Sequence, residues 1–158
     1  MRTIYAILAV SVLMFLASAA IFVISFRHAE QVPAAAPVAS VKQIMQGIVV
    51  PASMRIYNAV STTVTEKGTE EVVPRNDGEW EIVGSSAVAL VEAANLLKVG
   101  DRARDRGDWM RMSDALAKAA MQSYRAAEKK DVEALLAAGE VLNNSCGSCH
   151  RNYDVPIE

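Results

Sequence analysis

The sequence predicts an all-α protein, an antiparallel four-helix bundle preceded by one N-terminal transmembrane or signal helix. Three observations predict this fold: an uncharged apolar run at the N-terminus, four later stretches with apolar residues at steps of three and four, and a three-residue connection between the last two stretches. With 158 residues, the chain has room for one domain and little more. We divide it into an N-terminal segment at 1–27, a linker at 28–40 and a helical domain at 41–158.

The N-terminal run, residues 3–26, contains no charged side chain. A helix of this length spans about 36 Å, which is enough to cross a hydrocarbon core of about 30 Å. A cleaved signal peptide is the alternative, because Ala17–Ala19 offers a small-x-small site, but the apolar run continues past it and favours an anchor. The remainder is exported in either case. We expect a bacterial inner-membrane protein with its domain in the periplasm, or a soluble periplasmic protein after cleavage.

The composition beyond the N-terminal segment excludes several classes of function. Residues 29–40 are rich in proline and alanine, which is typical of a semi-extended linker. Subtracting Arg2 and Arg27 from 16 basic residues leaves 14 against 18 acidic ones, with no dense basic patch, so we expect no nucleic-acid partner. There is no Ser/His/Asp set and no phosphate-binding loop, so we do not expect an enzyme.

The first helix of the domain is expected to begin after Ser40, a good N-cap, and to run to about Val60. Pro51 lies inside this run and should kink or split it. The connection at 61–78 contains β-branched residues that suggest a strand, but we predict no partner strand and therefore no sheet. The apolar face of the first helix comprises Val41, Met45, Ile48, Ala52, Ile56 and Ala59.

Three further helices follow. The second begins near Asn76, with Glu79 at capping-box spacing, and ends before Gly100. The third runs from Asp108 to about Lys129, and the fourth is capped by Asp131. Their apolar stripes are Trp80, Val83, Ala87, Leu90, Ala94 and Leu97 on the second; Trp109, Met112, Leu116, Ala120 and Ser123 on the third; and Val132, Leu135, Leu136, Gly139, Leu142, Cys146, Cys149 and Tyr153 on the fourth.

The two cysteines of the chain, Cys146 and Cys149, lie in the fourth helix, with His150 directly after the second. Three residues apart on a helix, the thiols lie side by side, and a disulfide between them would close too small a loop to stabilise much. A thioredoxin-type dithiol would follow a strand, which the pattern lacks. A structural zinc site needs four ligands, and two thiols with one histidine do not supply them.

Haem attachment accounts for all three residues. In C-x-x-C-H the two thiols hold the haem covalently, and the histidine that follows is placed to bind the iron. We therefore expect one covalent haem c on Cys146 and Cys149, with His150 as the proximal axial ligand. Haem propionates need cationic partners when they are partly buried, and Arg151, Arg102 and Arg104 are the candidates.

A helical domain whose last helix ends in C-x-x-C-H-x-x-Y, here residues 146–153, resembles the class II c-type cytochromes. This family includes cytochrome c′ and its low-spin, methionine-ligated relatives. The resemblance covers about residues 40–155 and implies a four-helix bundle with haem between the helices near the end of the fourth. It does not cover the N-terminal segment, and Pro51 departs from the usual pattern. Homodimers are common in the family, but no helix face here requires one.

The resemblance implies that the sixth iron ligand comes from the first helix, which offers Met45 and Met54. Nine residues apart on a straight helix, they point in opposite directions, Met45 with the core face and Met54 outward. Met54 could reach the iron only through the kink at Pro51. We expect Met45 to fill the position and the protein to transfer electrons to membrane-bound redox partners. An open position would instead suit binding of NO or CO, as in cytochrome c′. A third interpretation is a membrane or assembly factor in which the motif is incidental.

Overall fold

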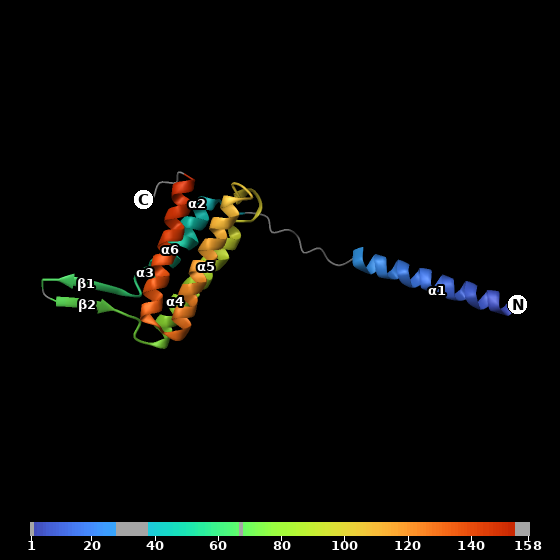
Figure 1. The fold of residues 1–158 in the computed structure, drawn as a ribbon, viewed down its shortest axis with the longest axis horizontal. Coiled ribbons are helices and arrows are strands. Elements are labelled where there is room, and N and C mark those ends of the chain that lie inside the picture. The colour runs from blue at the N-terminus through green and yellow to red at the C-terminus, as the bar shows by residue number, and fades with distance from the viewer. Residues whose placement is uncertain (1, 28–37, 67, 154–158) are drawn as a thin grey trace. The chain divides into compact units, whose positions relative to one another are not determined.

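The computed structural model describes residues 2–27, 38–66 and 68–153, with the side chains of the first helix described as far as Phe22. Most of the expected linker, residues 28–37, lies outside the described residues, as do Lys67 and residues 154–158. The chain divides into two compact units, residues 1–35 and 36–158 (Figure 1). Both units are mainly helical, as the sequence predicts, and the second also contains a small sheet.

The first unit contains α1 (Arg2–Arg27). Its stretch from Arg2 to Phe22 has a mean hydropathy of 2.5, and the described side chains are exposed throughout. The hydroxyls of Ser11 and Ser18 donate to the carbonyls four residues before them, at 3.0 and 2.9 Å, so neither needs water as a partner. The expected N-terminal helix is thus confirmed as one that is long and apolar enough to be a membrane span or a signal sequence.

The second unit opens with a helix that changes its winding. Ser40 caps α2 (Val41–Ile44) through a capping box with Gln43. A π-helical turn, η1 (Met45–Val49), follows, and then α3 (Val50–Tyr57). Pro51 has no N–H to donate to the preceding turn, and just before it the N–H of Val50 donates to the carbonyl of Met45, five residues back. The predicted split at Pro51 is therefore present as a π-turn.

The π-turn changes which side chains of this helix are buried. Ile44 and Val49, five residues apart, are the deepest side chains before Pro51, at 2% and 6% exposure. Met45 and Ile48 are only partly buried, although both pack against the core. Before the proline the predicted face therefore packs against the core without being its deepest part, because a π-turn advances less per residue around the helix axis than an α-helix does. Ala52 and Ile56, which follow the π-turn, are buried as predicted.

The second predicted helix is α4 (Asp77–Leu96). Asn76 caps it through the N–H of Glu79, at 3.0 Å, and the Glu79 carboxylate accepts from the N–H of Arg75. All six residues of its predicted apolar stripe are buried. The helix ends before Gly100, which has a positive φ of 62° and opens a short 3-10 turn, η2 (Gly100–Arg102).

The last two helices begin and end close to their predicted bounds. They are α5 (Asp108–Lys129) and α6 (Val132–Asn152), and the side chain of Asp131 caps α6 through the N–H of Ala134, at 2.9 Å. On α5, Trp109, Leu116, Ala120 and Ser123 are buried as predicted. On α6, Leu135 and Leu142 are buried, but Leu136 is 47% exposed and does not belong to the core.

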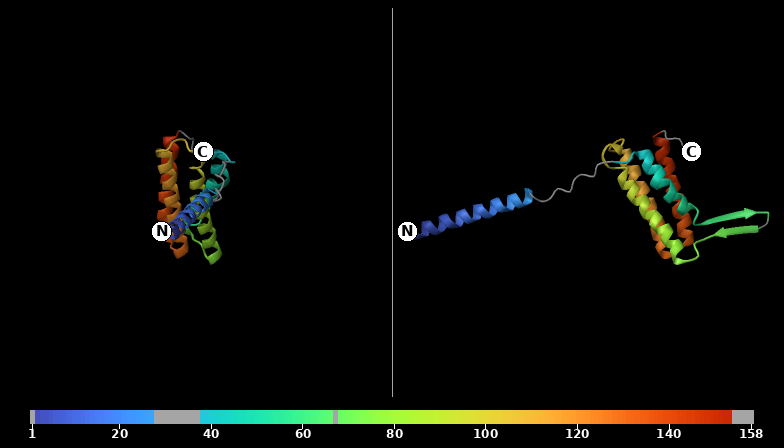
Figure 2. Two further views of the ribbon diagram at one scale, coloured as in Figure 1. Left: turned by 90° about the vertical axis from the view of Figure 1, so that its right-hand side faces the viewer. Right: turned by 180° about the vertical axis from the view of Figure 1, so that it is seen from behind.

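A β-hairpin between α3 and α4 overturns the prediction that the domain contains no strand. Strand β1 (Ser61–Thr65) pairs with the antiparallel strand β2 (Gly68–Val72), and the hairpin projects from the helices (Figure 2). The partner strand lies inside the same connection, four residues of which are threonine. Gly68, at a φ of +132°, permits the tight reversal of the chain.

The helices after Ser40 pack side by side around one hydrophobic core (Figures 1 and 2). At one end, which we call the cysteine end, η1, the start of α5 and the end of α6 meet. At the opposite end, which we call the hairpin end, the start of α4 lies beside the connection between α5 and α6, where Lys130 pairs with Asp77 at 2.8 Å. The core contains Ile44, Ile56, Val83, Leu90, Leu97, Trp109, Leu116, Leu135 and Leu142, together with closely packed alanines.

Candidate functional site

A cavity at the cysteine end brings together all four residues that the sequence singles out. Both thiols, the imidazole of His150 and the side chain of Met45 line it, although Met45 lies about one hundred residues before the others. Leu97 and Trp109 contribute from the end of α4 and the start of α5. The complete lining is Met45, Val49, Leu97, Trp109, Met112, Ser113, Leu116, Ser145, Cys146, Cys149 and His150.

The two cysteines lie on consecutive turns of α6 and are not joined to each other. Both are partly buried, and Cys146 packs against the hydrophobic core. Ser145 and Ser148, which flank Cys146 and Cys149, direct their hydroxyls to helix carbonyls at 2.8 Å. Because the serine hydroxyls bond to the backbone in this way, the thiols and the imidazole of His150 are the reactive groups that α6 presents to the cavity.

The surroundings of the thiols do not activate them as nucleophiles. Burial raises the pKa of Cys146, and burial together with the neighbouring Cys146 raises the pKa of Cys149. Burial and then the adjacent Cys146 also raise the pKa of Tyr57, on α3, to about 12. Reactive dithiols of redox enzymes have thiol pKa values below the ordinary range. The opposite shift here disfavours a thiol-exchange site.

His150 contributes a buried nitrogen to the same region. Its Nδ1 has no hydrogen-bond partner within the described part of the chain. A buried polar atom left without a partner costs about 1–3 kcal/mol, so such an atom calls for an explanation by a ligand or a functional role. In the described residues, no three His, Cys, Asp or Glu side chains come together as a metal cluster. The imidazole of His150 is therefore a nitrogen donor that the cavity offers to a ligand.

The two methionines of the first helical stretch lie in different environments. Met45 is partly buried, packs against the core and lines the cavity. Met54 is 48% exposed and lines a groove near the hairpin instead. The predicted orientations, Met45 toward the core and Met54 toward solvent, agree with these positions.

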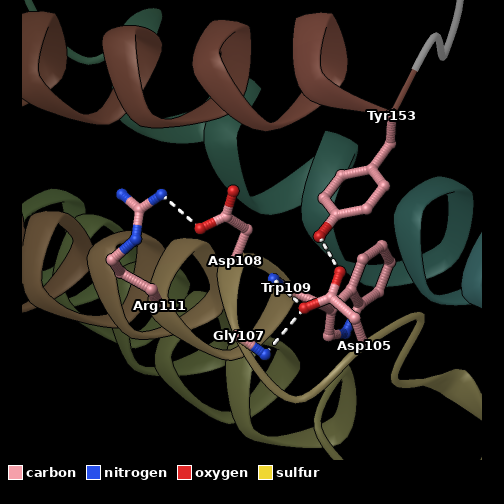
Figure 3. A network of polar contacts seen from close by, with 6 residues as sticks. All are labelled: Asp105, Gly107, Asp108, Trp109, Arg111 and Tyr153. Atoms are coloured by element: carbon pink, nitrogen blue, oxygen red, sulfur yellow. Dashed lines mark hydrogen bonds and ion pairs between the residues drawn. The ribbon is translucent and has the colours of Figure 1, made fainter.

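A polar network fastens the end of α6 to the loop before α5 (Figure 3). The hydroxyl of Tyr153 donates to Asp105 Oδ2, and the other carboxylate oxygen accepts from the N–H groups of Gly107 and Trp109, at 2.8 and 3.0 Å. The rings of Tyr153 and Trp109 also meet edge to face, with their centroids 5.0 Å apart. The network holds one wall of the cavity against the segment that carries the cysteines.

Trp109 is the link between this network and the cavity. Its indole is 5% exposed, and Nε1 donates to the carbonyl of Leu97 at 2.7 Å. The hydroxyl of Ser113, one turn later on α5, donates a hydrogen bond to the carbonyl of Trp109 at 2.8 Å. These bonds tie the end of α4 to the start of α5 where both line the cavity.

The three arginines considered for haem propionates have different surroundings. Arg102 is 8% exposed, and its guanidinium already donates to the carbonyls of Ala39 and Leu96, at 2.7 and 3.1 Å. Arg104 is exposed. Arg151 is also exposed and lies over Gly147, where an added Cβ would come within 3.0 Å of Nη1. Arg102 therefore has a structural role, and Arg151, which follows His150 and lies against Gly147 of the motif, is the remaining candidate beside the cysteines.

The donors of the cavity fit haem c in kind: two neighbouring thiols for the macrocycle, one imidazole for the iron and one thioether on another helix. The cavity has a volume of about 40 Å³, which is room for only a few water molecules. Binding of a porphyrin therefore requires the side chains at the cysteine end to move apart.

Comparison of the chain with protein-family models, with curated proteins and with solved structures gives no match.

Sequence reasoning identified the thiols, His150 and Met45 but missed the roles of Asp105 and Tyr153 as partners. The two are 48 residues apart, and no periodic pattern connects them. The one available signal is the loop at 101–108, where arginines alternate with aspartates.

Proposed function

We propose that this protein is a monohaem c-type cytochrome that transfers electrons and is not an enzyme. The observation that carries the proposal is the shared cavity at the cysteine end, which joins the C-x-x-C-H turn of α6 to Met45 of the first helical stretch. A thiol-exchange enzyme would not need the methionine, and an incidental motif would not need a buried imidazole nitrogen without a partner.

The proposal includes the fold of the class II c-type cytochromes, an antiparallel four-helix bundle. In support, the stretch formed by α2, η1 and α3 packs with α4, α5 and α6 around one core, and the cysteine motif ends the last helix. The β-hairpin is then an addition to the connection between the first and second helices of the bundle.

In this proposal Cys146 and Cys149 would hold the haem through thioether bonds, and His150 and Met45 would be the ligands of its iron. The haem would supply a one-electron couple between Fe(III) and Fe(II). With Met45 as a ligand, water and gas would be kept from the iron and its reduced state would be favoured. Trp109 and Leu97 shield the site from water, and the Tyr153–Asp105 hydrogen bond keeps the motif-bearing turn in place.

Covalent haem is testable without knowledge of a redox partner. The chain should be produced together with a cytochrome maturation system and separated by denaturing electrophoresis, and the gel should be stained for haem peroxidase activity. We expect a stained band at the mass of the protein. Replacement of both Cys146 and Cys149 by alanine should abolish the stain. An unstained band for the unmodified chain would refute the proposal.

The proposed location is the outer side of a bacterial inner membrane, with α1 as an uncleaved anchor that keeps the haem domain beside membrane-bound redox partners. The length and apolar composition of α1 support this location. The intact mass of the purified protein distinguishes an anchor from a signal. Retention of α1 is expected, whereas a mature chain that begins at Ala20 would show a soluble periplasmic protein.

A further inference from the structure

The hairpin formed by β1 and β2 is exposed on both faces and along both outer edges. All ten strand residues except Ser61 are exposed, and within the described residues the sheet has no third strand. An isolated two-stranded hairpin is marginally stable in water. Its unpaired N–H and C=O groups form a template for an added strand. The hairpin is therefore the element of the second unit that gains most from a binding partner.

An apolar groove lies at the base of the hairpin, on the side of β2. Its volume is about 350 Å³. Met54, Val72 and Ile82 line it and are 48%, 40% and 49% exposed. Arg55 and Glu79 add charged groups to its lining. Val72 belongs both to β2 and to the groove, so the edge of the strand and the groove form one continuous surface.

The hairpin carries negative charge on both faces. Glu70 pairs across the ladder with Thr63, and Glu71 with Thr62, so the two carboxylates lie on opposite faces. Neither forms an ion pair with another described residue. Three glutamates and one lysine occur between Ser61 and Val72, a formal charge of −2. Two copies paired edge to edge would bring these carboxylates together, which disfavours a second copy as the occupant.

Other segments of the chain are also unsuitable occupants. Residues 154–158 follow Tyr153 at the cysteine end and span at most about 17 Å, whereas the 21 residues of α6 that separate the two ends span about 32 Å. Residues 28–37 contain Glu30, Pro33 and Pro37. The prolines cannot donate to a ladder, and a glutamate does not complement an acidic hairpin.

We propose that the edge of β2 and the adjoining groove bind an extended, positively charged segment of another protein. The segment adds a third strand to the hairpin through main-chain hydrogen bonds. It places cationic side chains on the face of the hairpin that carries Glu71, and apolar side chains on the face of Val72, one of them in the groove between Met54 and Ile82.

This docking surface lies at the end of the helices opposite the cysteine cavity, so a protein bound there leaves the cavity free. The partner would hold the cytochrome in an assembly while the haem exchanges electrons elsewhere. That role rests on the proposed function, whereas the binding itself does not. Binding should therefore persist in the variant that lacks both cysteines, which separates a failure of this inference from a failure of the haem assignment.

The experiment uses the full chain in detergent and three blocked nonapeptides as probes. The first alternates lysine with valine, the second has glutamate in place of lysine, and the third is the lysine peptide with alternate backbone nitrogens methylated. Hydrogen exchange of residues 61–72 is followed by mass spectrometry. The lysine peptide should slow this exchange, and the other two should not. Slowing by the methylated peptide to the same extent would exclude strand addition, because that peptide lacks the donors.

Variants locate the surface. Replacement of both Glu70 and Glu71 by lysine should weaken binding of the lysine peptide about tenfold or more, and the control Glu133→Lys on α6 should leave it unchanged. Ile82→Asn should also weaken binding, with Leu136→Asn as the matched control because the two side chains are 49% and 47% exposed. Equal binding by the charge-reversed hairpin would overturn the proposal. Hairpin exchange that slows as the protein itself is concentrated would assign the surface to a second copy and would also overturn it.

Discussion

The two ends of the second unit are built in contrasting ways. At the cysteine end, side chains from four separate helical segments close around a small cavity, and Trp109, Arg102 and Asp105 all have hydrogen-bond partners. At the hairpin end, β1 and β2 form a local structure whose side chains are exposed, beside an open groove with exposed Met54 and Ile82. The first end depends on contacts between residues far apart in sequence, and the second on neighbours.

This contrast is consistent with the two proposals, a haem site at the cysteine end and a docking surface at the hairpin end. A haem site must exclude water and hold its ligands in place, which requires a closed end whose side chains are joined by hydrogen bonds. A docking surface must offer unpaired edges and apolar side chains to another molecule, which requires an open end. We therefore expect substitutions at the cysteine end to change spectra and stability strongly, and substitutions at the hairpin end to change neither.

The largest difference between the two ends is expected when Met45 at the cysteine end and Met54 at the hairpin end are each replaced by alanine and the haem spectra are compared. The unmodified protein should be low-spin, show a thioether-to-iron band near the red end of the spectrum when oxidised, and bind no CO when reduced at neutral pH. Met45→Ala should open the iron and give a high-spin form that binds CO. Met54→Ala should leave the spectra unchanged. If the unmodified protein is already high-spin and binds CO, the gas-binding alternative replaces electron transfer.

A second comparison concerns stability. Trp109→Ala removes a side chain that is 5% exposed and its hydrogen bond to Leu97, so it should lower the free energy of unfolding by about 3–5 kcal/mol. Val64→Ala on β1, where the side chain is 77% exposed, should change it by no more than about 0.5 kcal/mol. Urea denaturation of the haem-free chain measures both. Similar losses at the two sites would contradict the contrast between the ends.

The smallest expected effect is the dependence of the Tyr153–Asp105 contact on pH. The hydrogen bond from the Tyr153 hydroxyl, and after it the hydrogen bond from the Trp109 N–H, lowers the pKa of Asp105. The stability that Asp105 contributes is therefore present above its unfolded pKa of about 3.9 and is lost as the pH falls through its lower folded pKa. Burial and then the hydrogen bond to Asp105 raise the pKa of Tyr153 to about 12. The contribution of Tyr153 is complete below its unfolded pKa of about 10 and is lost as the pH rises toward 12.

Tyr153→Phe keeps the ring on Trp109 and removes only the hydroxyl. Its urea midpoint should lie below that of the unmodified protein between about pH 5 and 9 and approach it at both extremes. Arg111→Ala, which removes only the exposed ion pair with Asp108, is the control and should show no such profile. A difference between Tyr153→Phe and the unmodified protein that is constant with pH would show that the hydroxyl acts through packing alone.

The helices and their caps could be predicted from sequence because their signals are local. Ser40, Asn76 and Asp131 each accept a backbone N–H at the start of a helix, as their positions indicated. The C-x-x-C-H motif is equally local, and the haem attachment that it indicates stays a prediction. Periodicity also identified the buried stripe of α4, because that helix has uniform geometry from end to end.

The features that we predicted wrongly or not at all lie where local sequence signals conflict or where no local signal exists. Pro51 predicted a break in the helix but not that the break would be a π-turn. Because of that turn, the deepest side chains before the proline are Ile44 and Val49, whereas the helical pattern had indicated Met45 and Ile48. The hairpin was missed because we sought a partner strand outside the connection rather than within it. The Tyr153–Asp105 contact spans 48 residues and depends on how the helices pack.

The buried guanidinium of Arg102 has a mechanical consequence. It fastens the carbonyl of Ala39 to the end of α4, directly before the capping box that starts α2. Because Ala39 directly precedes this helix cap, tension applied to the chain before residue 38 would act on the Arg102 hydrogen bonds before it acts on α2. Part of such a load would pass to α4 through the bond to the carbonyl of Leu96.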